Sequence, residues 1–352
     1  MNYPEPKYPR GMVDLAGDTL IDQATDLDAY EHALQIINNW RSCHHLPLRF
    51  FRVWLTRIAK QVDPKCLIAQ RIKRLPAIKL KLELLRRHSV TLSEMQDIGG
   101  CRVVVKNLAV LHQWVRSHER SQVQYKLDYK DDYIERPKNT GYRGIHLIYR
   151  YRSEQYNSHN DLRVEIQLRS PLQHAWATAV ETVGIFTGEA LKSNLGSNDW
   201  RRFFALMGTA IAMREKATLV PGTPHTRKEV VAELRDCVST LDAQTRLRTY
   251  SAMLRMPRHP GLEKARYFLL ELDSTAQKIM VTGYANSQLN AAHETLLEVE
   301  RALAARPECT GSHAVLVSVG SLASLKRAYP NYFLDMRVFI EEVARALTSH
   351  PE

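Results

Sequence analysis

The cysteine patterns that hold small domains or zinc ions together are missing from this 352-residue sequence. Its five cysteines are scattered, and no two of them form a Cys-x-x-Cys pair. Zinc sites and disulfide frameworks use paired spacings, so we expect neither, and a reducing cytoplasm fits this usage best. The five are Cys43, Cys66, Cys101, Cys237 and Cys309.

Long apolar runs are missing as well. No stretch approaches the roughly 20 apolar residues that are required to cross a bilayer. The first residues, MNYPEPKYPRGM, lack the basic flank and apolar run of a secretory signal. We therefore expect a soluble, cytoplasmic protein with no membrane partner.

The common motifs of phosphate handling and hydrolysis are absent too. The sequence has no G-x-x-x-x-G-K-[S/T] loop, no H-R-D triplet, no H-E-x-x-H and no G-x-S-x-G. These absences argue against P-loop NTPases, protein kinases, zinc proteases of this type and α/β-hydrolases. Any chemistry on ATP must use another scaffold.

Composition is that of a globular protein, with 44% hydrophobic and 25% charged residues. The length suits two or three domains. A net charge of +11 and a pI near 9.4 favour anionic partners such as nucleotides, RNA or a lipid surface. Charge alone is equally compatible with a basic surface that binds nothing specific.

Strands and helices alternate between about residues 71 and 215, which predicts a sheet covered by helices, an α/β arrangement. The strand candidates, rich in branched and aromatic residues, are 101–105, 144–151 and 162–168. The helix candidates are 76–87, 108–120, 171–183 and 199–217.

The N-terminal segment is predicted to be helical after an extended start. The first twenty or so residues are rich in Pro and Gly, which favours an extended surface segment. A helix should begin near Thr25 or Asp26, and a second helix carries an apolar stripe that includes Phe51. We interpret the adjacent His44 and His45 as surface residues, because no third metal ligand is near.

A linker is expected at 219–225, where LVPGTPH contains two prolines and a glycine. Beyond it we expect helix to about Leu272 and then a small separate α/β unit, with strands at 278–284 and 313–319 and helices near 286–305 and 333–347. The predicted domains are an N-terminal helical segment at 1–62, a catalytic domain at 63–218 and a C-terminal domain of unknown role at 226–352.

One strand presents three polar side chains on a single face. In LRVEIQLRS, side chains alternate, so Val164, Ile166 and Leu168 point one way. Glu165, Gln167 and Arg169 then point the other way. Taken alone, this pattern is also typical of a half-buried strand with a solvated face.

A second carboxylate precedes the strand at 101–105. Asp97 is followed by Gly99 and Gly100, which allow a tight turn or close backbone approach. A carboxylate at one strand edge and another on a neighbouring strand can hold magnesium, so Asp97 and Glu165 are a candidate pair. A turn or capping role for Asp97 is the alternative.

Two basic segments could bind phosphates or bases. Residues 71–87 contain seven cationic side chains and a single acidic one, Glu83. The cations could neutralise a triphosphate or form a solvated helix face. In the loop DDYIERPKNTGYRGIH, Tyr142 is flanked by cationic residues and could stack on a base. Each of these residues could instead have an ordinary loop or packing role. The seven cations are Arg71, Lys73, Arg74, Lys79, Lys81, Arg86 and Arg87.

Taken in order, these segments resemble the synthetase domain of the RelA/SpoT family. The matching motifs are R-x-K-x-x-x-A-I-x-x-K-L (71–82), D-I-G-G-x-R (97–102), D-Y-I-x-x-P-K-x-x-G-Y-R-G-I-H (132–146) and V-E-I-Q-L-R-S (164–170). Each motif is weak alone, but four in the right order are specific. They cover about 150 residues, less than half of the chain.

The resemblance implies a nucleotidyltransferase-like mixed sheet flanked by helices, and transfer of pyrophosphate from ATP to the 3′ hydroxyl of GDP or GTP, with AMP leaving. Asp97 and Glu165 would hold Mg²⁺, Glu165 could accept the hydroxyl proton, and Arg102 would lie near the metal-binding acid. Donor residues would be Arg71, stacked on adenine, with Lys73, Lys79 and Lys81 at the phosphates. Acceptor residues would be Tyr142, stacked on the base, with Lys138, His146, Gln167 and Arg169.

The sequence also departs from the family pattern. Ala77 and Gly144 stand where hydroxyl residues are common, which puts fine positioning of the phosphates in doubt. No His-Asp dipeptide occurs, so the family's hydrolase domain is not expected, and the chain resembles a synthetase-only member with an added C-terminal unit.

Three functions stay open at this stage. The first is a guanosine tetra- or pentaphosphate synthetase. The second is a toxic relative that modifies tRNA 3′ ends or adenosine nucleotides, with residues 220–352 as a fused neutralising or sensing domain or as the site of a regulatory partner. The third is a non-catalytic nucleotide- or RNA-binding module. Homo-oligomerisation is also open.

Overall fold

The computed structural model describes most of the chain. The described residues are 3–22, 26–85, 90–120, 125–187, 197–252, 262, 265–273, 278–304, 312–333 and 335–348. Three parts of the predictions lie outside them: the possible helix start at Thr25, the cations Arg86 and Arg87, and Cys309.

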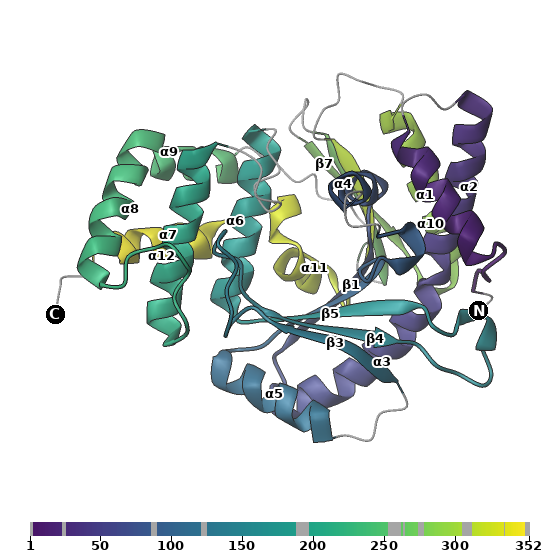
Figure 1. Cartoon of the computed structure of the whole chain (residues 1–352), viewed down its shortest axis with the longest axis horizontal. Coiled ribbons are helices and arrows are strands. Elements are labelled where there is room, and N and C mark those ends of the chain that lie inside the picture. The colour runs from purple at the N-terminus through teal and green to yellow at the C-terminus, as the bar shows by residue number, and fades with distance from the viewer. Residues whose placement is uncertain are drawn as a thin grey trace.

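A mixed sheet of eight strands forms the centre of the molecule (Figure 1). Its order is β3-β4-β5-β2-β1-β8-β6-β7. Strands β2 and β5 run parallel, and the other pairs among the described strands are antiparallel. The bounds are β1 Leu67–Ile72, β2 Gly99–Val104, β3 Lys126–Asp132, β4 Ile145–Arg150, β5 Arg163–Arg169, β6 Tyr267–Asp273, β7 Lys278–Tyr284 and β8 His313–Ser318.

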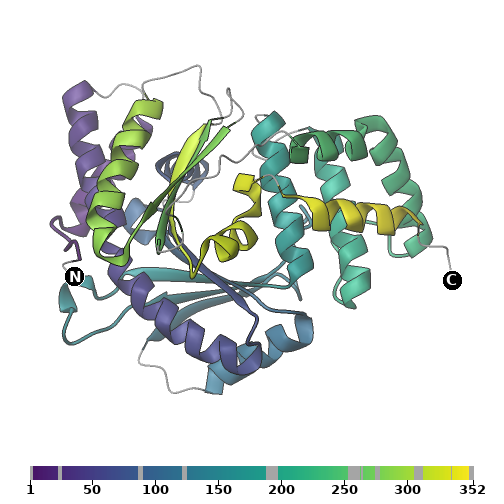
Figure 2. The same ribbon diagram turned by 180° about the vertical axis from the view of Figure 1, so that it is seen from behind.

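Helices flank this sheet on both faces and at one end, which confirms the predicted α/β class (Figures 1 and 2). None of the helices within the described ranges has the length and apolar character that crossing a bilayer requires. The α-helices are α1 Arg10–Ile21, α2 Leu27–Cys43, α3 His45–Val62, α4 Leu75–Leu85, α5 Leu108–Arg120, α6 Pro171–Thr187, α7 Asn198–Glu215, α8 Arg227–Leu241, α9 Ala243–Ala252, α10 Leu289–Ala304, α11 Leu322–Ala328 and α12 Arg337–Thr348.

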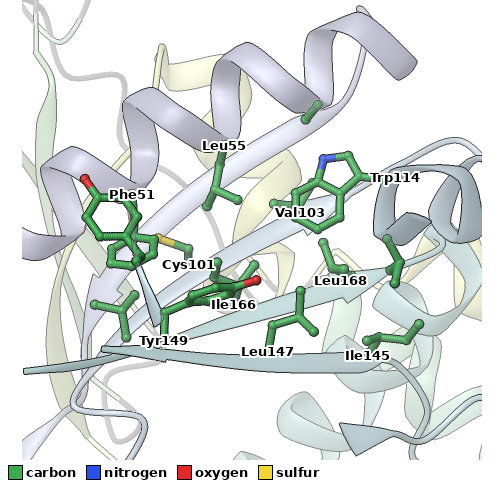
Figure 3. Close-up of a cluster of buried hydrophobic side chains, with 14 of the residues drawn as sticks. Phe51, Leu55, Cys101, Val103, Trp114, Ile145, Leu147, Tyr149, Ile166 and Leu168 are labelled. Atoms are coloured by element: carbon green, nitrogen blue, oxygen red, sulfur yellow. The ribbon is translucent and has the colours of Figure 1, made fainter. Parts of the chain in front are cut away.

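The main core lies between the sheet and helices α3 and α5 (Figure 3). Val164, Ile166 and Leu168 of β5 all point into it, as the alternation of that strand predicts. Phe51 of α3 and Trp114 of α5 cover them from the helix side and are fully buried. The opposite face of β5 is therefore free to carry the polar residues of a site.

A second cluster of helices stands at one end of the sheet (Figure 1). Helices α6 and α7 pack there with α8, α9 and α12 around an apolar core that includes Trp200, Phe204 and Phe339. The last helix of the chain thus packs on helices of the predicted catalytic domain.

The C-terminal strands extend the same sheet and do not form a separate one. Strand β8 pairs with β1, where Gln70 lies opposite Ser318 and Arg71 opposite Val317. Without β8, the edge of β1 would leave backbone groups unpaired, which is unfavourable in a long apolar sheet. The expectation of a separate unit is therefore corrected, while the predicted domain boundaries themselves stay predictions.

The N-terminal segment is less extended than predicted. Residues 10–21 form α1, whose Val13, Ala16 and Leu20 recur at helical spacing and are buried. The prediction of an extended segment was based on the glycine content, but Gly17 lies inside the helix and allows close packing on Leu92. A Cβ added at Gly17 would lie 2.8 Å from the Leu92 Cβ. The next helix begins as predicted, with the Asp26 carboxylate accepting from the Ala29 amide.

His44 and His45 are buried, so their interpretation as surface residues is wrong. They lie at the junction of α2 and α3, and the His44 ring bonds to the Trp40 carbonyl oxygen. Burial lowers the pKa of His44 to about 4 and that of His45 well below its ordinary value. The rings of His45 and His293 meet edge to face at 5.5 Å. Both histidines therefore pack as neutral rings.

Three strands differ from the sequence prediction. Arg71 and Ile72 end strand β1, and helix α4 begins only at Leu75. The charged segment 126–132 was not among the strand candidates but forms the edge strand β3, where charge disfavours further pairing. Residues 267–273, predicted as helix, form β6 because Tyr267 and Phe268 favour a strand and the segment pairs on both sides.

Gly208 of α7 allows the backbone at Gly141 to approach. A Cβ at residue 208 would lie 2.8 Å from the Gly141 Cα and 2.9 Å from its carbonyl oxygen. We predict that Gly208→Ala lowers the free energy of unfolding by roughly 1–3 kcal/mol, because backbone must move. Urea unfolding measures this, with Gly11→Ala as the control.

The control position lies in α1 and has open space around it. Alanine there should be neutral or stabilising by about 0.5–1 kcal/mol, as expected for Gly→Ala within a helix. Equal effects of the two substitutions would contradict the close approach at Gly208.

Candidate active site

The parallel pair β2–β5 brings two carboxylates together. Gly100 of β2 lies opposite Glu165 of β5, and Asp97 lies just before β2. The two carboxylates are close enough to each other that the negative charge of Glu165 acts to raise the pKa of Asp97. The two carboxylates predicted from sequence therefore lie within range of each other's charge.

Two lysines neutralise Asp97. Lys73 Nζ lies 2.7 Å from Oδ2, and Lys81 Nζ lies 2.8 Å from Oδ1. Burial and Glu165 would raise the pKa of Asp97, but the two ammonium groups outweigh them and hold it below its ordinary value. Asp97 is therefore ionised at neutral pH.

Glu165 is held by two neighbours. His146 Nδ1 lies 2.8 Å from Oε1, and the Gln167 amide donates to Oε2 at 2.6 Å. Burial would raise the pKa of Glu165, but His146 and Gln167 hold it well below its ordinary value. For His146, burial favours a lower pKa, yet Tyr142 and Glu165 raise it to about 9. The pair is an imidazolium and a carboxylate at neutral pH.

A closed ring of hydrogen bonds connects five predicted site residues. Arg169 Nη2 donates to the Gln167 side-chain oxygen at 3.0 Å and to the Tyr142 hydroxyl at 2.9 Å. Tyr142 in turn lies 2.5 Å from His146 Nε2, which closes the ring through Glu165. The ring fixes the orientation of each member, because moving one breaks two contacts.

Tyr142 is buried rather than open to a ligand. Its ring is 5% exposed and lies beneath Lys138, whose Nζ is 5.7 Å from the ring centroid. Lys138 lies closer to the ring of Tyr133, at 4.4 Å, and Tyr133 meets His146 edge to face. Sequence reasoning missed Tyr133, although it belongs to the D-Y-I motif and is a second ring beside the same cations.

Arg102 is buried beneath the C-terminal part of the chain. Its Nη1 donates to the Ala328 carbonyl oxygen at 2.7 Å, and its guanidinium lies 5.4 Å from the ring centroid of Tyr329. Burial, with Arg169 and Arg71 nearby, lowers the pKa of Arg102 to about 10. The end of α11 therefore covers one face of the predicted site.

His174 marks the other end of this contact. Its Nε2 bonds to the Arg327 carbonyl oxygen at 3.0 Å, one residue before Ala328. Burial, Arg102 and Arg169 lower the pKa of His174 to about 3, so the ring is neutral and donates to that carbonyl. Neither His174 nor Tyr329 was among the predicted site residues, since both act across long sequence separations.

Two predicted donor residues lie apart from the Asp97 contacts. Lys79 is exposed on α4, two residues from Lys81 and so on another side of the helix. Arg71 lies on β1 opposite Gly100, and its charge acts on Arg102. A cavity of about 380 Å³ between α7, α8 and α12 contains none of the predicted site residues.

The donor set fits magnesium. Within the described ranges, no group of three or more His, Cys, Asp or Glu residues is placed to hold a metal ion. Two carboxylates suit Mg²⁺, which keeps several waters and takes further oxygens from substrate phosphates, whereas an all-protein cage suits other ions. Asp97 and Glu165, both ionised and adjacent, match that requirement.

Comparisons with known proteins match the part of the chain that contains these residues. Residues 70–184 match the family model described as a region found in RelA / SpoT proteins, and that range contains every predicted site residue. Over 100 residues, the sequence is 33% identical to GTP pyrophosphokinase YjbM of Bacillus subtilis, covering 28% of this chain and 47% of YjbM. The chain thus spans about half the length of the curated relative that it matches.

Solved structures of similar fold include small alarmone synthetase 1 from Bacillus subtilis bound to its product pppGpp. It is 22% identical, with a TM-score of 0.42, over 49% of this chain and 90% of that chain. A GTP pyrophosphokinase family protein from Streptococcus pneumoniae is 19% identical, with a TM-score of 0.42, over 62% of this chain and 98% of that one.

The raised pKa of His146 predicts how stability depends on pH. Protonated His146 stabilises the fold fully below pH 6.5, and this contribution is lost as the pH rises toward 9. We predict that the stability difference between wild type and His146→Gln falls by roughly 2 kcal/mol from pH 6 to pH 9. Urea unfolding across this range measures it.

The buried histidines with lowered pKa values titrate below this window, so they do not contribute to it. Parallel pH profiles of the wild type and the His146 variant would contradict an ionised His146–Glu165 pair.

Proposed function

We propose that this chain, whose residues 70–184 carry the region found in RelA/SpoT proteins, transfers pyrophosphate from ATP to a nucleotide hydroxyl. The observation that carries the proposal is the adjacent ionised pair Asp97 and Glu165, surrounded by Lys73, Lys81 and His146. Pyrophosphate transfer needs positioning and charge neutralisation more than covalent chemistry, and this group of residues supplies both.

The lysines would bind the donor phosphates. An ammonium group has three donors, so Lys73 and Lys81 can each keep a bond to Asp97 and offer the others to phosphate oxygens. Lys79 could extend this cationic face from the solvent side of α4. Arg71 would stack on adenine, and Arg102, on the adjacent strand, would lie near the metal-binding acid.

Asp97 and Glu165 would hold the magnesium ion. When bound, Mg²⁺ supplies positive charge to the oxygens of the group being transferred. The low pKa of Glu165 keeps it anionic, which favours its role in holding the ion over its role as a strong general base. The ring through His146, Tyr142, Arg169 and Gln167 keeps this carboxylate in one orientation.

The acceptor is proposed to be GDP or GTP, whose 3′ hydroxyl would attack the β-phosphate of ATP, with AMP leaving. Support comes from the 33% identity to a protein named GTP pyrophosphokinase. Lys138, Tyr133 and Tyr142 form a cation-and-ring group beside His146, where a base could stack once Lys138 moves aside. A tRNA end or an adenosine nucleotide stays the alternative acceptor, and a cytoplasmic location stays a prediction.

Glu165→Gln tests the catalytic claim. The substitution keeps the shape but removes the charge that neighbours His146, so we predict a loss of transfer of about a hundredfold or more. The assay uses ATP labelled on its β-phosphate with GDP, GTP, ATP or deacylated tRNA offered separately.

Glu233→Gln is the matched control, because Glu233 pairs with Arg202 on the half-exposed surface of the helical cluster. Label that reaches no acceptor, although ATP binds, would favour a non-catalytic binding module. Label on tRNA alone would keep the chemistry and replace the acceptor.

We also propose that the C-terminal part of the chain restrains the donor site. The support is the contact of Arg102 with Ala328 and Tyr329, which occupies a guanidinium face that would otherwise be open to ATP at the metal site. A partner that withdraws α11 would uncover Arg102. Such a restraint agrees with the alternative in which residues 220–352 are a fused neutralising or sensing domain.

Tyr329→Ala should expose the guanidinium face, so we predict at least a threefold gain in ATP affinity, measured by calorimetry with a non-hydrolysable ATP analogue. Tyr329→Phe keeps the ring and should leave ATP affinity unchanged. Because Tyr329 is buried, the melting temperature of each variant is recorded to confirm folding. Equal ATP affinities for the alanine and phenylalanine variants would contradict the restraint.

A further inference from the structure

A buried ion pair connects the first and last thirds of the chain. Arg41 of α2 donates to both carboxylate oxygens of Glu300 on α10, at 2.7 Å and 2.9 Å. The two side chains are 1% and 8% exposed. Arg41 also donates to the Asn38 side-chain oxygen at 2.9 Å, so its donors are well used. The nearby His293 is neutral, since burial lowers its pKa to about 4.

The Arg41–Glu300 pair also binds the backbone of the turn that contains Lys73. Arg41 Nε donates to the Lys73 carbonyl oxygen at 3.1 Å, and the Leu75 amide points at Glu300 Oε1 at 3.4 Å. On its other side, the Lys73 amide donates to the Ile98 carbonyl oxygen at 2.8 Å, next to Asp97. The backbone of Lys73 is therefore fixed from two directions.

This arrangement decides where the Lys73 ammonium can go. The turn leads directly into α4, which begins at Leu75 and carries Lys81. Both lysines reach the two oxygens of one carboxylate, Asp97. A shift of the turn by an ångström would misplace both cations, and site geometry is sensitive to such shifts.

We propose that Arg41 and Glu300 are positioning residues for the phosphate-binding lysines Lys73 and Lys81. The inference rests on the proposed function and deepens it, because it makes α10 part of the support of the donor site. Residue 300 lies within the segment 226–352 whose role the sequence left open. The anion recognised is a polyphosphate chain, bound by the two lysines that this pair holds in register.

A role limited to holding α2 against α10 explains the pair less well. Burying two charges costs desolvation, and replacing a buried ion pair by apolar residues often leaves stability unchanged or improves it. An apolar pair could join α2 to α10, but it could not donate to the Lys73 carbonyl or accept from the Leu75 amide. The polar identity of the pair is therefore tied to the turn.

The test measures binding of magnesium tripolyphosphate to the full chain by calorimetry, with Glu300→Gln as the variant. We expect its affinity to fall about tenfold, as loss of a charged anchor for the turn implies. Glu342→Gln is the matched control: Glu342 is also 8% exposed and joins C-terminal α12 to Arg214 of α7, away from the lysines. Equal affinities for the two variants would overturn the proposal.

A double variant, Arg41→Met with Glu300→Met, separates positioning of the lysines from the packing of α2 against α10. We expect it to unfold near the wild-type urea concentration yet to bind tripolyphosphate as weakly as Glu300→Gln. Wild-type affinity in this stable double variant would overturn the proposal. Pyrophosphate transfer is assayed separately, so its absence in the wild type would contradict the proposed function alone and leave the binding result standing.

Discussion

Neutralising one buried and one half-buried carboxylate is the constraint on which the rest of this structure depends. Glu165 of β5 and Asp97, just before the neighbouring parallel strand β2, lie within range of each other's charge, and neither charge could be withdrawn from water without partners. Lys73 and Lys81 form ion pairs with Asp97. His146 and Gln167 bind the Glu165 carboxylate. The apolar face of β5, against α3 and α5, keeps this polar face in place. The site and the core are two faces of one strand.

The C-terminal third of the chain reaches this centre by two independent routes. Strand β8 extends the sheet beside β1, and the end of α11 covers Arg102. Helix α10 supports the turn at Lys73 through Glu300. In the proposals made above, the contact at Arg102 restrains the donor site and the contact at Lys73 supports it, so the loss of the whole segment would combine opposite effects. Single substitutions are needed to separate them.

Sequence reasoning found what local patterns encode. The alternation in LRVEIQLRS placed Glu165, Gln167 and Arg169 on one face, and the bounds of α5 were predicted as they stand. It missed contacts between distant residues: 226 positions separate Arg102 from Ala328, and 259 separate Arg41 from Glu300. Periodicity carries no information about such pairs. It also misread β1, whose strand character depends on pairing with β2 and β8.

The central claim is that Asp97 and Glu165 form one divalent-metal site, and manganese tests it most directly. Titration of the protein with Mn²⁺, followed by electron paramagnetic resonance of the free ion, reports occupancy without any need for activity. The account predicts one site in the wild type that loses most of its affinity in Asp97→Asn and equally in Glu165→Gln. Manganese binding that survives in either variant would contradict a shared site.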